Sequence, residues 1–137
     1  MLRVSWKPRV YRDIEIEGAK SLSALAEAIV GAYDFSFDHA FGFYSNLKNP
    51  YDRSGERYEL FADMEDTDSD AGSVERTRVA QVFNAAGKKM LFLFDYGDEW
   101  RFQVELTRLG EKKPKARYPR LVATTGEAPS QYPDEDE

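Results

Sequence analysis

The 137-residue chain contains no cysteine and only one histidine, His39. The absence of cysteine excludes disulfide scaffolds and cysteine-based zinc sites, and the single histidine leaves one imidazole for any mechanism that needs one. No apolar run approaches the roughly 20 residues that cross a bilayer, and residues 1–7 alternate in polarity instead of forming the apolar centre of a signal peptide. We therefore expect a cytoplasmic protein without a membrane segment.

The standard catalytic and nucleotide-binding signatures are absent as well. The sequence has no phosphate-binding P-loop, no G-x-G-x-x-G, no G-x-S-x-G and no H-E-x-x-H. We accordingly expect no cofactor and no dedicated metal site. No internal repeat or linker divides the chain, whose length and 42% hydrophobic content fit one domain with its own core.

The net charge of −6 is distributed unevenly along the chain. Residues 59–70 hold six acidic side chains and residues 134–137 hold four, and neither stretch contains a lysine or arginine. Basic side chains gather late in the sequence, at Arg108, Lys112, Lys113, Lys115, Arg117 and Arg120. This segment either forms an ordinary solvated surface or binds an acidic partner, a nucleic acid or a protein.

Residues 63–72 form an acidic stretch in which Asp66, Asp68 and Asp70 alternate, as carboxylates do at the start of a calcium loop. The remaining positions do not fit that motif. Its glycine is displaced to Gly72, and its twelfth position is Thr77 where a bidentate glutamate is required. We therefore interpret the stretch as an acidic loop and not as a cation site.

Hydrophobic periodicity predicts two helices and several strands. Apolar residues at helical spacing predict a helix over residues 22–33, with Ser21 as its N-cap. A second helix is expected around Val79, capped near Ser73 and ended by Gly87. Alternating or continuous apolar patterns predict strands over residues 1–6, 10–17, 39–44, 58–61, 90–94 and 100–106.

These elements predict an α+β fold, a single domain in which two helices pack on a mostly antiparallel sheet. We place the domain at residues 1–123. Residues 124–137, which are rich in Gly, Ala, Pro, Ser and acidic residues, are expected to form an extended acidic C-terminal tail.

The turn between the last two strands concentrates the most specific residues. Asp95 and Asp98 stand three residues apart around Tyr96 and Gly97, and Trp100 follows at core parity. Paired carboxylates can share a proton, hold a metal or cap backbone N–H groups. Gly97 is expected to supply a positive φ. The turn is therefore either a structural feature stabilised by ion pairs or a binding or catalytic site.

Two further residues bear on this choice. Arg12 lies on the apolar face of the predicted strand 10–17, where a cation needs a partner or an exit to solvent, and Asp95 or Asp98 are its expected partners. His39 is either a general base or metal ligand acting with these carboxylates, or a packed and hydrogen-bonded residue.

Several blocks of the sequence resemble the plasmid pRiA4b ORF-3-like family, which is also met as an insertion-sequence passenger with a resolvase-type name. The most specific block is F-D-Y-G-D-E-W at residues 94–100, and P-R-V-Y-R-D-I at residues 8–14 supports it. The helix from Leu22 with Y-D at residues 33–34 and H-A-F at residues 39–41 forms a third supporting block, and Y-P-R at residues 118–120 and G-E-A-P at residues 126–129 resemble the family's endings. The resemblance implies a compact α+β domain around a mostly antiparallel sheet, and no established activity.

The sequence also departs from this family at two residues, and it lacks the cysteine and Gly-Gly that often follow the family's P-P-E-D block. Phe102 stands where many relatives have a histidine, and Ser130 replaces the second proline of the family's P-P-E-D ending. Any metal or catalytic role that depends on those residues is therefore weakened here. The sequence offers no serine-recombinase signature that would support the resolvase-type name.

Three functions remain open from the sequence. The leading prediction is a small binding or accessory domain linked to plasmid or mobile-element biology. The first alternative is a hydrolytic enzyme, metal- or carboxylate-dependent, that uses Asp95, Asp98 and His39. The second is a nucleic-acid-binding protein that uses residues 108–120. The predicted binding residues are Arg12, Tyr96, Gly97, Trp100, Tyr118 and Arg120.

Overall fold

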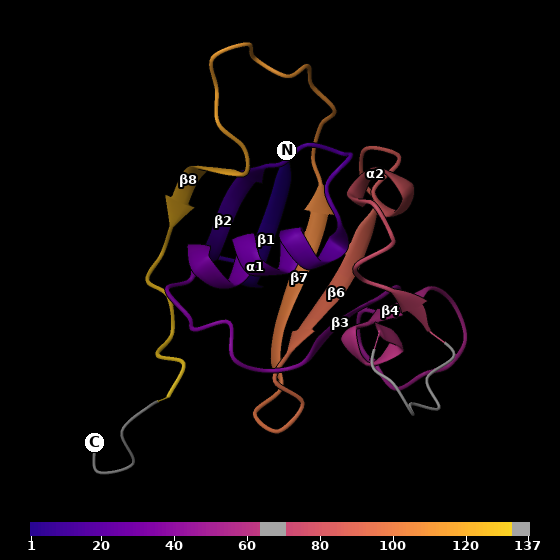
Figure 1. The fold of residues 1–137 in the computed structure, drawn as a ribbon. Coiled ribbons are helices and arrows are strands. Elements are labelled where there is room, and N and C mark those ends of the chain that lie inside the picture. The colour runs from indigo at the N-terminus through magenta and orange to yellow at the C-terminus, as the bar shows by residue number, and fades with distance from the viewer. Residues whose placement is uncertain (64–70, 133–137) are drawn as a thin grey trace.

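The computed structural model describes residues 1–63 and 71–132, and its described strands form one sheet with the order β5-β4-β3-β6-β7-β1-β2-β8 (Figure 1). All neighbouring strands are antiparallel except β4 and β5. The elements are β1 (Leu2–Lys7), β2 (Val10–Glu15), α1 (Leu22–Ala32), β3 (Phe41–Tyr44), β4 (Arg57–Glu59), a 3-10 helix (Leu60–Asp63), β5 (Gly72–Ser73), α2 (Val79–Val82), β6 (Lys89–Phe94), β7 (Trp100–Leu106) and β8 (Arg120–Thr125). The predicted α+β architecture, with two helices and a mostly antiparallel sheet, is confirmed.

The centre of the sheet joins two hairpins that are remote in the sequence. The β6–β7 hairpin is formed as predicted, and β1 pairs with β7 in a register that places Val4 opposite Val104. On its other side β1 pairs with β2, and β2 pairs with β8. Because β1 and β7 both alternate in polarity, their apolar side chains enter the same face of the sheet.

Helix α1 crosses that face and closes the main core (Figure 1). Its predicted N-cap is confirmed, because the Ser21 hydroxyl accepts the Ala24 N–H at 3.0 Å. The helix buries one stripe of side chains against the sheet, at Leu22, Leu25, Ala26, Ile29 and Val30. No helix in the described part of the chain has the length and apolar character that crossing a membrane requires.

Helix α2 is a single turn and is much shorter than predicted. Its N-cap is Arg78, whose N–H donates to the Gln81 side chain at 2.7 Å, whereas Ser73 lies in β5. Gly87 does have a positive φ, but its N–H donates to the Leu106 carbonyl, so it leads into β6 and does not end the helix. The prediction of both helix ends was wrong, because the chain leaves the helix at Phe83 while keeping that ring buried.

The opposite face of the sheet carries a second, smaller cluster around Tyr44, Leu91 and Leu93. The turn-rich residues 46–56 are tied to this face, because Arg101 donates to the Lys48 carbonyl at 3.0 Å. The calcium-like part of the acidic stretch, residues 66–70, lies outside the described residues. Its interpretation as an acidic loop therefore stays a prediction.

The C-terminal segment leaves the sheet after Thr125 and crosses to the connection between α1 and β3. There the Gln131 side chain is buried, accepts the Ser36 N–H at 2.7 Å and donates to the Ser36 carbonyl at 3.1 Å. The division into a domain of residues 1–123 and a tail of residues 124–137 stays a prediction, and residues 133–137 lie outside the described residues.

Candidate functional site

The Asp95 turn is held by its own carboxylate. Asp95 has φ +65° and is buried, and its Oδ1 accepts the N–H groups of Gly97 at 3.0 Å and Asp98 at 3.3 Å. The positive φ values fall on Asp95 and Glu99, so the expectation of one at Gly97 was wrong. Aspartate tolerates this conformation because its short side chain bonds to the local backbone. Asp98 is solvent-exposed, whereas Asp95 is buried.

His39 precedes β3 and faces this turn, as the first alternative required. Its Nε2 lies 3.5 Å from Asp95 Oδ2, 3.5 Å from Asp38 Oδ1 and 2.6 Å from the Tyr132 hydroxyl. The Tyr132 hydroxyl donates to Asp38 Oδ2 at 2.8 Å, so its oxygen accepts a hydrogen bond from His39 Nε2 in the tautomer that carries the imidazole proton on Nε2. Partial desolvation and the bond to Asp38 raise the pKa of Tyr132 to about 12.

In that tautomer Nε2, the nitrogen that faces Asp95, is a hydrogen-bond donor, and the free lone pair lies on Nδ1. A general base needs a free lone pair on the nitrogen that takes the proton. The His39, Asp38 and Tyr132 contacts, together with the buried Gln131, instead fasten the C-terminal segment to the end of β3 and β6. Within residues 1–63 and 71–132, no group of three or more His, Cys, Asp or Glu side chains could hold a metal ion.

Arg12 does not pair with Asp95 or Asp98, so that expectation was wrong. Its buried guanidinium donates to the carbonyls of Ala32 at 3.2 Å, Tyr11 at 3.0 Å and Thr125 at 2.9 Å, and lies 4.8 Å from the centre of the Tyr33 ring. The last carbonyls of a helix carry partial negative charge. Arg12 is therefore compensated by the C-terminal end of α1 and by β8 carbonyls, and it connects β2, α1 and β8.

Tyr96 belongs to a hydroxyl chain on the second face of the sheet. Its hydroxyl lies 2.6 Å from that of Tyr44, which donates to Glu59 Oε2 at 2.5 Å, so Tyr96 donates to Tyr44. Burial raises the pKa of both tyrosines above their ordinary value. A Cβ at Gly42 would meet the Tyr44 hydroxyl at 2.6 Å, so this glycine makes room for the chain. Sequence reasoning missed Gly42, although an isolated glycine in a strand signals such a close approach.

Trp100 lies at the edge of the main core, where its ring centre is 5.0 Å from that of Phe35 and 6.1 Å from that of Trp6. Its indole N–H is buried and has no hydrogen-bond partner among the described residues. Of the predicted site residues, Asp95, His39, Tyr96 and Trp100 therefore gather around one end of β6. Their contacts are mainly structural.

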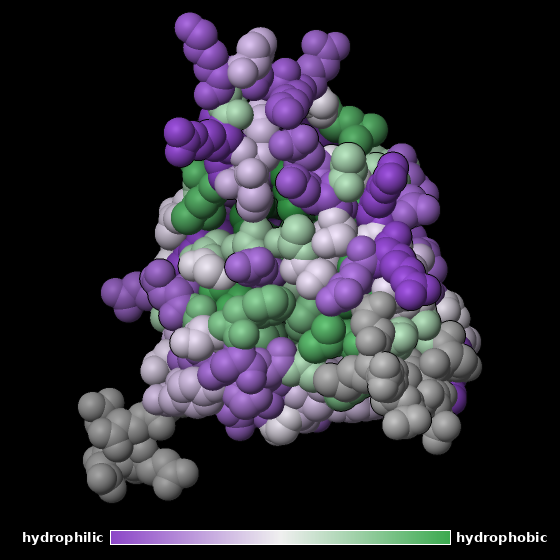
Figure 2. Space-filling view, in the orientation of Figure 1, coloured by the Kyte–Doolittle hydropathy of each residue, from purple (hydrophilic) through white to green (hydrophobic). Residues whose placement is uncertain are grey.

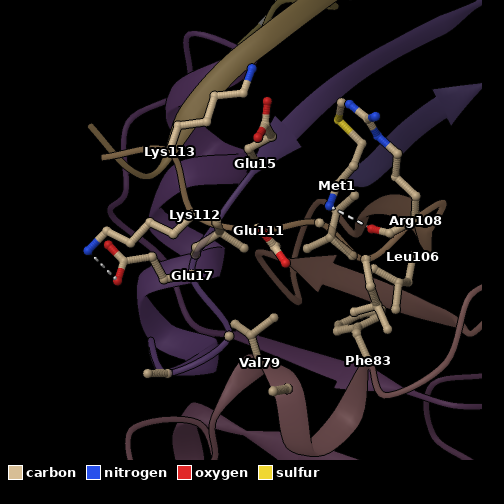
Figure 3. A pocket seen from close by; sticks show the side chains of 17 residues that line it. Met1, Glu15, Glu17, Val79, Phe83, Leu106, Arg108, Glu111, Lys112 and Lys113 are labelled. Atoms are coloured by element: carbon tan, nitrogen blue, oxygen red, sulfur yellow. Dashed lines mark hydrogen bonds and ion pairs between the residues drawn. The ribbon is translucent and has the colours of Figure 1, made fainter. Parts of the chain in front are cut away.

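A cavity of about 460 Å³ opens at the opposite end of the sheet, where β7 ends and β1 begins (Figure 3). Its apolar walls come from four buried side chains, Leu2, Val79, Phe83 and Leu106. Helix α2 packs closely against Gly18, whose lack of a side chain makes this possible: a Cβ at Gly18 would meet the Ala80 Cβ at 2.8 Å. No sequence motif predicts this cavity, because the residues of its walls have the periodicity of ordinary core residues.

The rim of the cavity is formed largely by the basic segment. Arg108, Lys112 and Lys113 line it together with Glu15, Glu17 and Glu111 (Figure 3). Two of the acids are already paired, because Lys112 Nζ lies 3.4 Å from Glu17 Oε2 and Arg120 Nε lies 3.6 Å from Glu15 Oε1. The Tyr118 hydroxyl accepts the Lys113 N–H at 3.1 Å and so shapes the loop. The predicted binding residues Tyr118 and Arg120 thus support this rim.

Comparison with known proteins agrees with this architecture. The family model described as plasmid pRiA4b ORF-3-like protein matches residues 2–134. The chain belongs to this family. A similar fold is present in a crystal structure of MM3350, a protein of unknown function from Methanosarcina mazei Go1, with a TM-score of 0.72. The two sequences are 20% identical over 93% of this chain and 68% of that one, a likeness that shows the fold alone. No curated protein matches this pRiA4b ORF-3-like chain.

Proposed function

We propose that this pRiA4b ORF-3-like protein is a binding module that holds a small amphiphilic anion in the cavity between β1, β7 and α2. The observation that carries the proposal is the combination of an apolar interior with cationic side chains at the rim. Small-molecule sites are typically concave and mostly apolar, with a few polar groups that orient the ligand, and their volumes run from about 300 to 1,000 Å³.

The interior suits a hydrocarbon or aromatic group. Phe83, Val79 and Leu106 line the cavity and are held in place by the surrounding chain, so an apolar ligand group would meet a preformed apolar wall. Removing apolar ligand surface from water favours binding by about 25 cal/mol per Å² before the costs of association.

The rim suits an acidic group. Once the ion pairs of Glu17 with Lys112 and of Glu15 with Arg120 are taken into account, Arg108 and Lys113 remain without an acidic partner in the described structure. Among the described residues that line the cavity, Glu111 is the one acidic side chain outside these ion pairs, so the unpaired charge of the lining is mainly positive. A ligand carboxylate or phosphate would gain charge-assisted hydrogen bonds there.

Two matched probes test the proposal by ¹⁵N NMR titration. Octanoate has an apolar chain and a carboxylate, whereas octanol has the same chain without the charge. We expect octanoate to shift the amide resonances of Val79, Phe83 and Leu106, and octanol to bind about tenfold more weakly because it lacks one charged hydrogen bond.

Three variants show whether the rim makes this difference. Arg108→Ala and Lys113→Ala should each weaken octanoate binding several-fold. Lys115→Ala is the matched control, since Lys115 is a cation of the same loop that does not line the cavity. If octanoate leaves the cavity resonances in place, or if Lys115→Ala weakens binding as much as Arg108→Ala, the proposed site is wrong.

A second candidate function is supported by the loop that joins β7 to β8. Residues 107–119 project from the body of the molecule (Figure 1), where Figure 2 shows mainly hydrophilic side chains. The loop carries five cationic side chains and one acid, and its cations are solvent-exposed. Such a loop suits phosphate groups of a nucleic acid, whose binding weakens steeply with salt.

Filter binding of a duplex and of a single-stranded oligonucleotide over a salt series tests this candidate. Each phosphate contact contributes roughly 0.7 to 0.9 to the salt dependence, expressed as the slope of log K against log salt. Replacing Lys115 and Arg117 by alanine should reduce the magnitude of that slope by the contribution of about two phosphate contacts, and it should leave octanoate binding unchanged. No retention at low salt would end this candidate.

The other sequence-based functions stay predictions. The Asp95 turn gives the hydrolytic alternative little support, because Asp98 is solvent-exposed and His39 Nε2 is hydrogen-bonded to the Tyr132 hydroxyl. A role in plasmid or mobile-element biology rests on the family name, and a cytoplasmic location rests on the sequence pattern.

A further inference from the structure

Strand β8 forms one edge of the sheet, and no strand in the described part of the chain pairs with its outer side. Exposed edges of this kind are normally protected by charged side chains or proline. Residues 121–126 contain neither, and Leu121 and Val122 are 50% and 40% exposed. The register shift with β2 lies between Asp13 and Ile14, so residues 123–125 keep regular strand pairing.

A hollow beside β8 explains why Leu121 is exposed. Leu121 pairs with Ile14, which is buried beneath α1, but the helix does not extend over β8. The space between them, about 210 Å³, is lined mainly by apolar groups of Ala28, Gly31, Ala32 and Leu121. A Cβ at Gly31 would meet nothing within 4 Å, so this side of the helix leaves room for another chain.

The charges that flank β8 select an antiparallel partner of the same sequence. Arg120 begins the strand and Glu127 lies just beyond its end, with no charged residue between them. If two β8 strands pair antiparallel, each Arg120 comes near Glu127 of the other copy. Parallel pairing would instead bring like charges together, which is unfavourable.

We propose that a second copy of this chain pairs with β8, antiparallel and across a two-fold axis near Ala123. The two sheets become continuous, and both α1 helices lie on the same side of the joined sheet. The hollow beside each Leu121 then gains its missing wall from the other copy. An isologous interface of this kind, in which the same patch serves both partners, is the commonest arrangement of homodimers.

Sedimentation equilibrium on the full chain over a range of micromolar concentrations measures the association. We expect a monomer–dimer equilibrium, and Leu121→Lys should raise the dimer dissociation constant about tenfold or more, because each copy would place an ammonium in the apolar seam. Leu109→Lys is the matched control, since Leu109 is 70% exposed and lies in the β7–β8 loop. Circular dichroism confirms that both variants are folded.

A single engineered cysteine tests the register in this cysteine-free chain. Directly opposed residues of antiparallel strands have Cα atoms about 4.5 to 5.5 Å apart, within the range that a disulfide bridges. Ala123→Cys should therefore form a covalent dimer under mild oxidation by dissolved oxygen, and Leu109→Cys should not.

Three results would overturn the proposal. The first is a protein that stays monomeric at every concentration, and the second is a dimer that Leu121→Lys does not weaken. The third is a dimer in which Ala123→Cys cross-links no better than Leu109→Cys, since the copies would then associate through another surface. A monomer that instead takes an extended peptide of another protein onto β8 would also refute self-pairing.

Discussion

Replacing Asp95 by Asn, Gly and Ala separates the contributions that hold the turn between β6 and β7. Asparagine keeps an acceptor at the position of Oδ1 and tolerates positive φ, but it loses the negative charge. Glycine keeps the conformational freedom and loses the acceptor. Alanine loses both, so the three variants form a graded series at one position.

The magnitudes follow from the geometry of the turn. The two backbone N–H groups that donate to Oδ1, at 3.0 and 3.3 Å, contribute about 0.5 to 1.5 kcal/mol each. Holding a non-glycine residue in the left-handed region at φ +65° costs roughly 1 to 2 kcal/mol where no side-chain bond compensates. We therefore expect unfolding free energies lower by about 3 kcal/mol for Ala, about 2 kcal/mol for Gly and under about 1 kcal/mol for Asn.

Urea denaturation followed by tryptophan fluorescence measures these differences, provided that the slope of free energy against urea stays constant across the series. The matched variant Gly97→Ala should cost less than about 1 kcal/mol, since Gly97 has no positive φ and its Cβ would meet only Asp95 Oδ1, at 3.3 Å. If Asn were as harmful as Ala, the charge facing His39 would be the main contribution. The assignment of the turn to backbone capping would then be refuted.

Three further predictions concern other parts of the fold. Arg12→Met should lower the unfolding free energy by about 3 to 5 kcal/mol, because three carbonyls around a buried site lose their hydrogen-bond donor. Arg3→Met, the control, breaks a half-exposed ion pair and should cost under about 1 kcal/mol. Equal losses of unfolding free energy in urea denaturation would contradict this prediction. Burial raises the pKa of Tyr33 from 10.0 to about 12, so the folded state keeps a proton that the unfolded chain releases. This contribution, about 3 kcal/mol, is present below pH 10 and lost as the pH rises through 12, and Tyr33→Phe should remove that part of the alkaline loss. Gln131→Ala should speed hydrogen exchange of the Ser36 amide about tenfold while exchange in β6 and β7 stays unchanged, and equal exchange in both proteins would rule out the tether.

Much of the fold was predictable because the local signals agree with the tertiary structure. Helix α1 has a capping serine and a regular apolar stripe, and from Phe102 to Leu106 strand β7 alternates between buried and partly exposed residues. The continuous apolar run of β6 correctly indicated a strand that is covered on both faces. Each of these elements is specified within its own sequence window.

The errors arose where long-range contacts override local pattern. Val79, Val82 and Phe83 have helical spacing, but packing against the sheet buries Phe83 after a single turn. The apolar parity of Arg12 left two interpretations open, a partner or an exit to solvent. Arg12 is buried, but its partners include carbonyls of Ala32 and Thr125, and a sequence pattern does not show which carbonyls are free to accept. The positive φ of Asp95 was also missed, because that conformation was expected at the neighbouring Gly97.

The candidate site was the least predictable feature. The sequence drew attention to Asp95 and Asp98, whereas the larger cavity lies at the other end of the sheet. Its cationic rim was visible as a cluster of lysines and arginines, but its apolar walls come from three elements, β1, α2 and β7, whose residues each look like ordinary core. Only the pairing of β1 with β7 brings those segments together.

The position of β1 inside the sheet also bears on the order in which the chain can fold during synthesis. The β1–β2 hairpin is synthesised before the other strands of the sheet, but its two outer edges pair with β7 and β8, the last two strands in the sequence. Until then a nascent chain holds two unsatisfied strand edges and an apolar face, the features that invite aggregation and chaperone binding. Helix α1, which follows directly, can cover the apolar face early, while the edges must wait for residues 100–125. The sheet of this domain is therefore completed only after residues 100–125 have been synthesised.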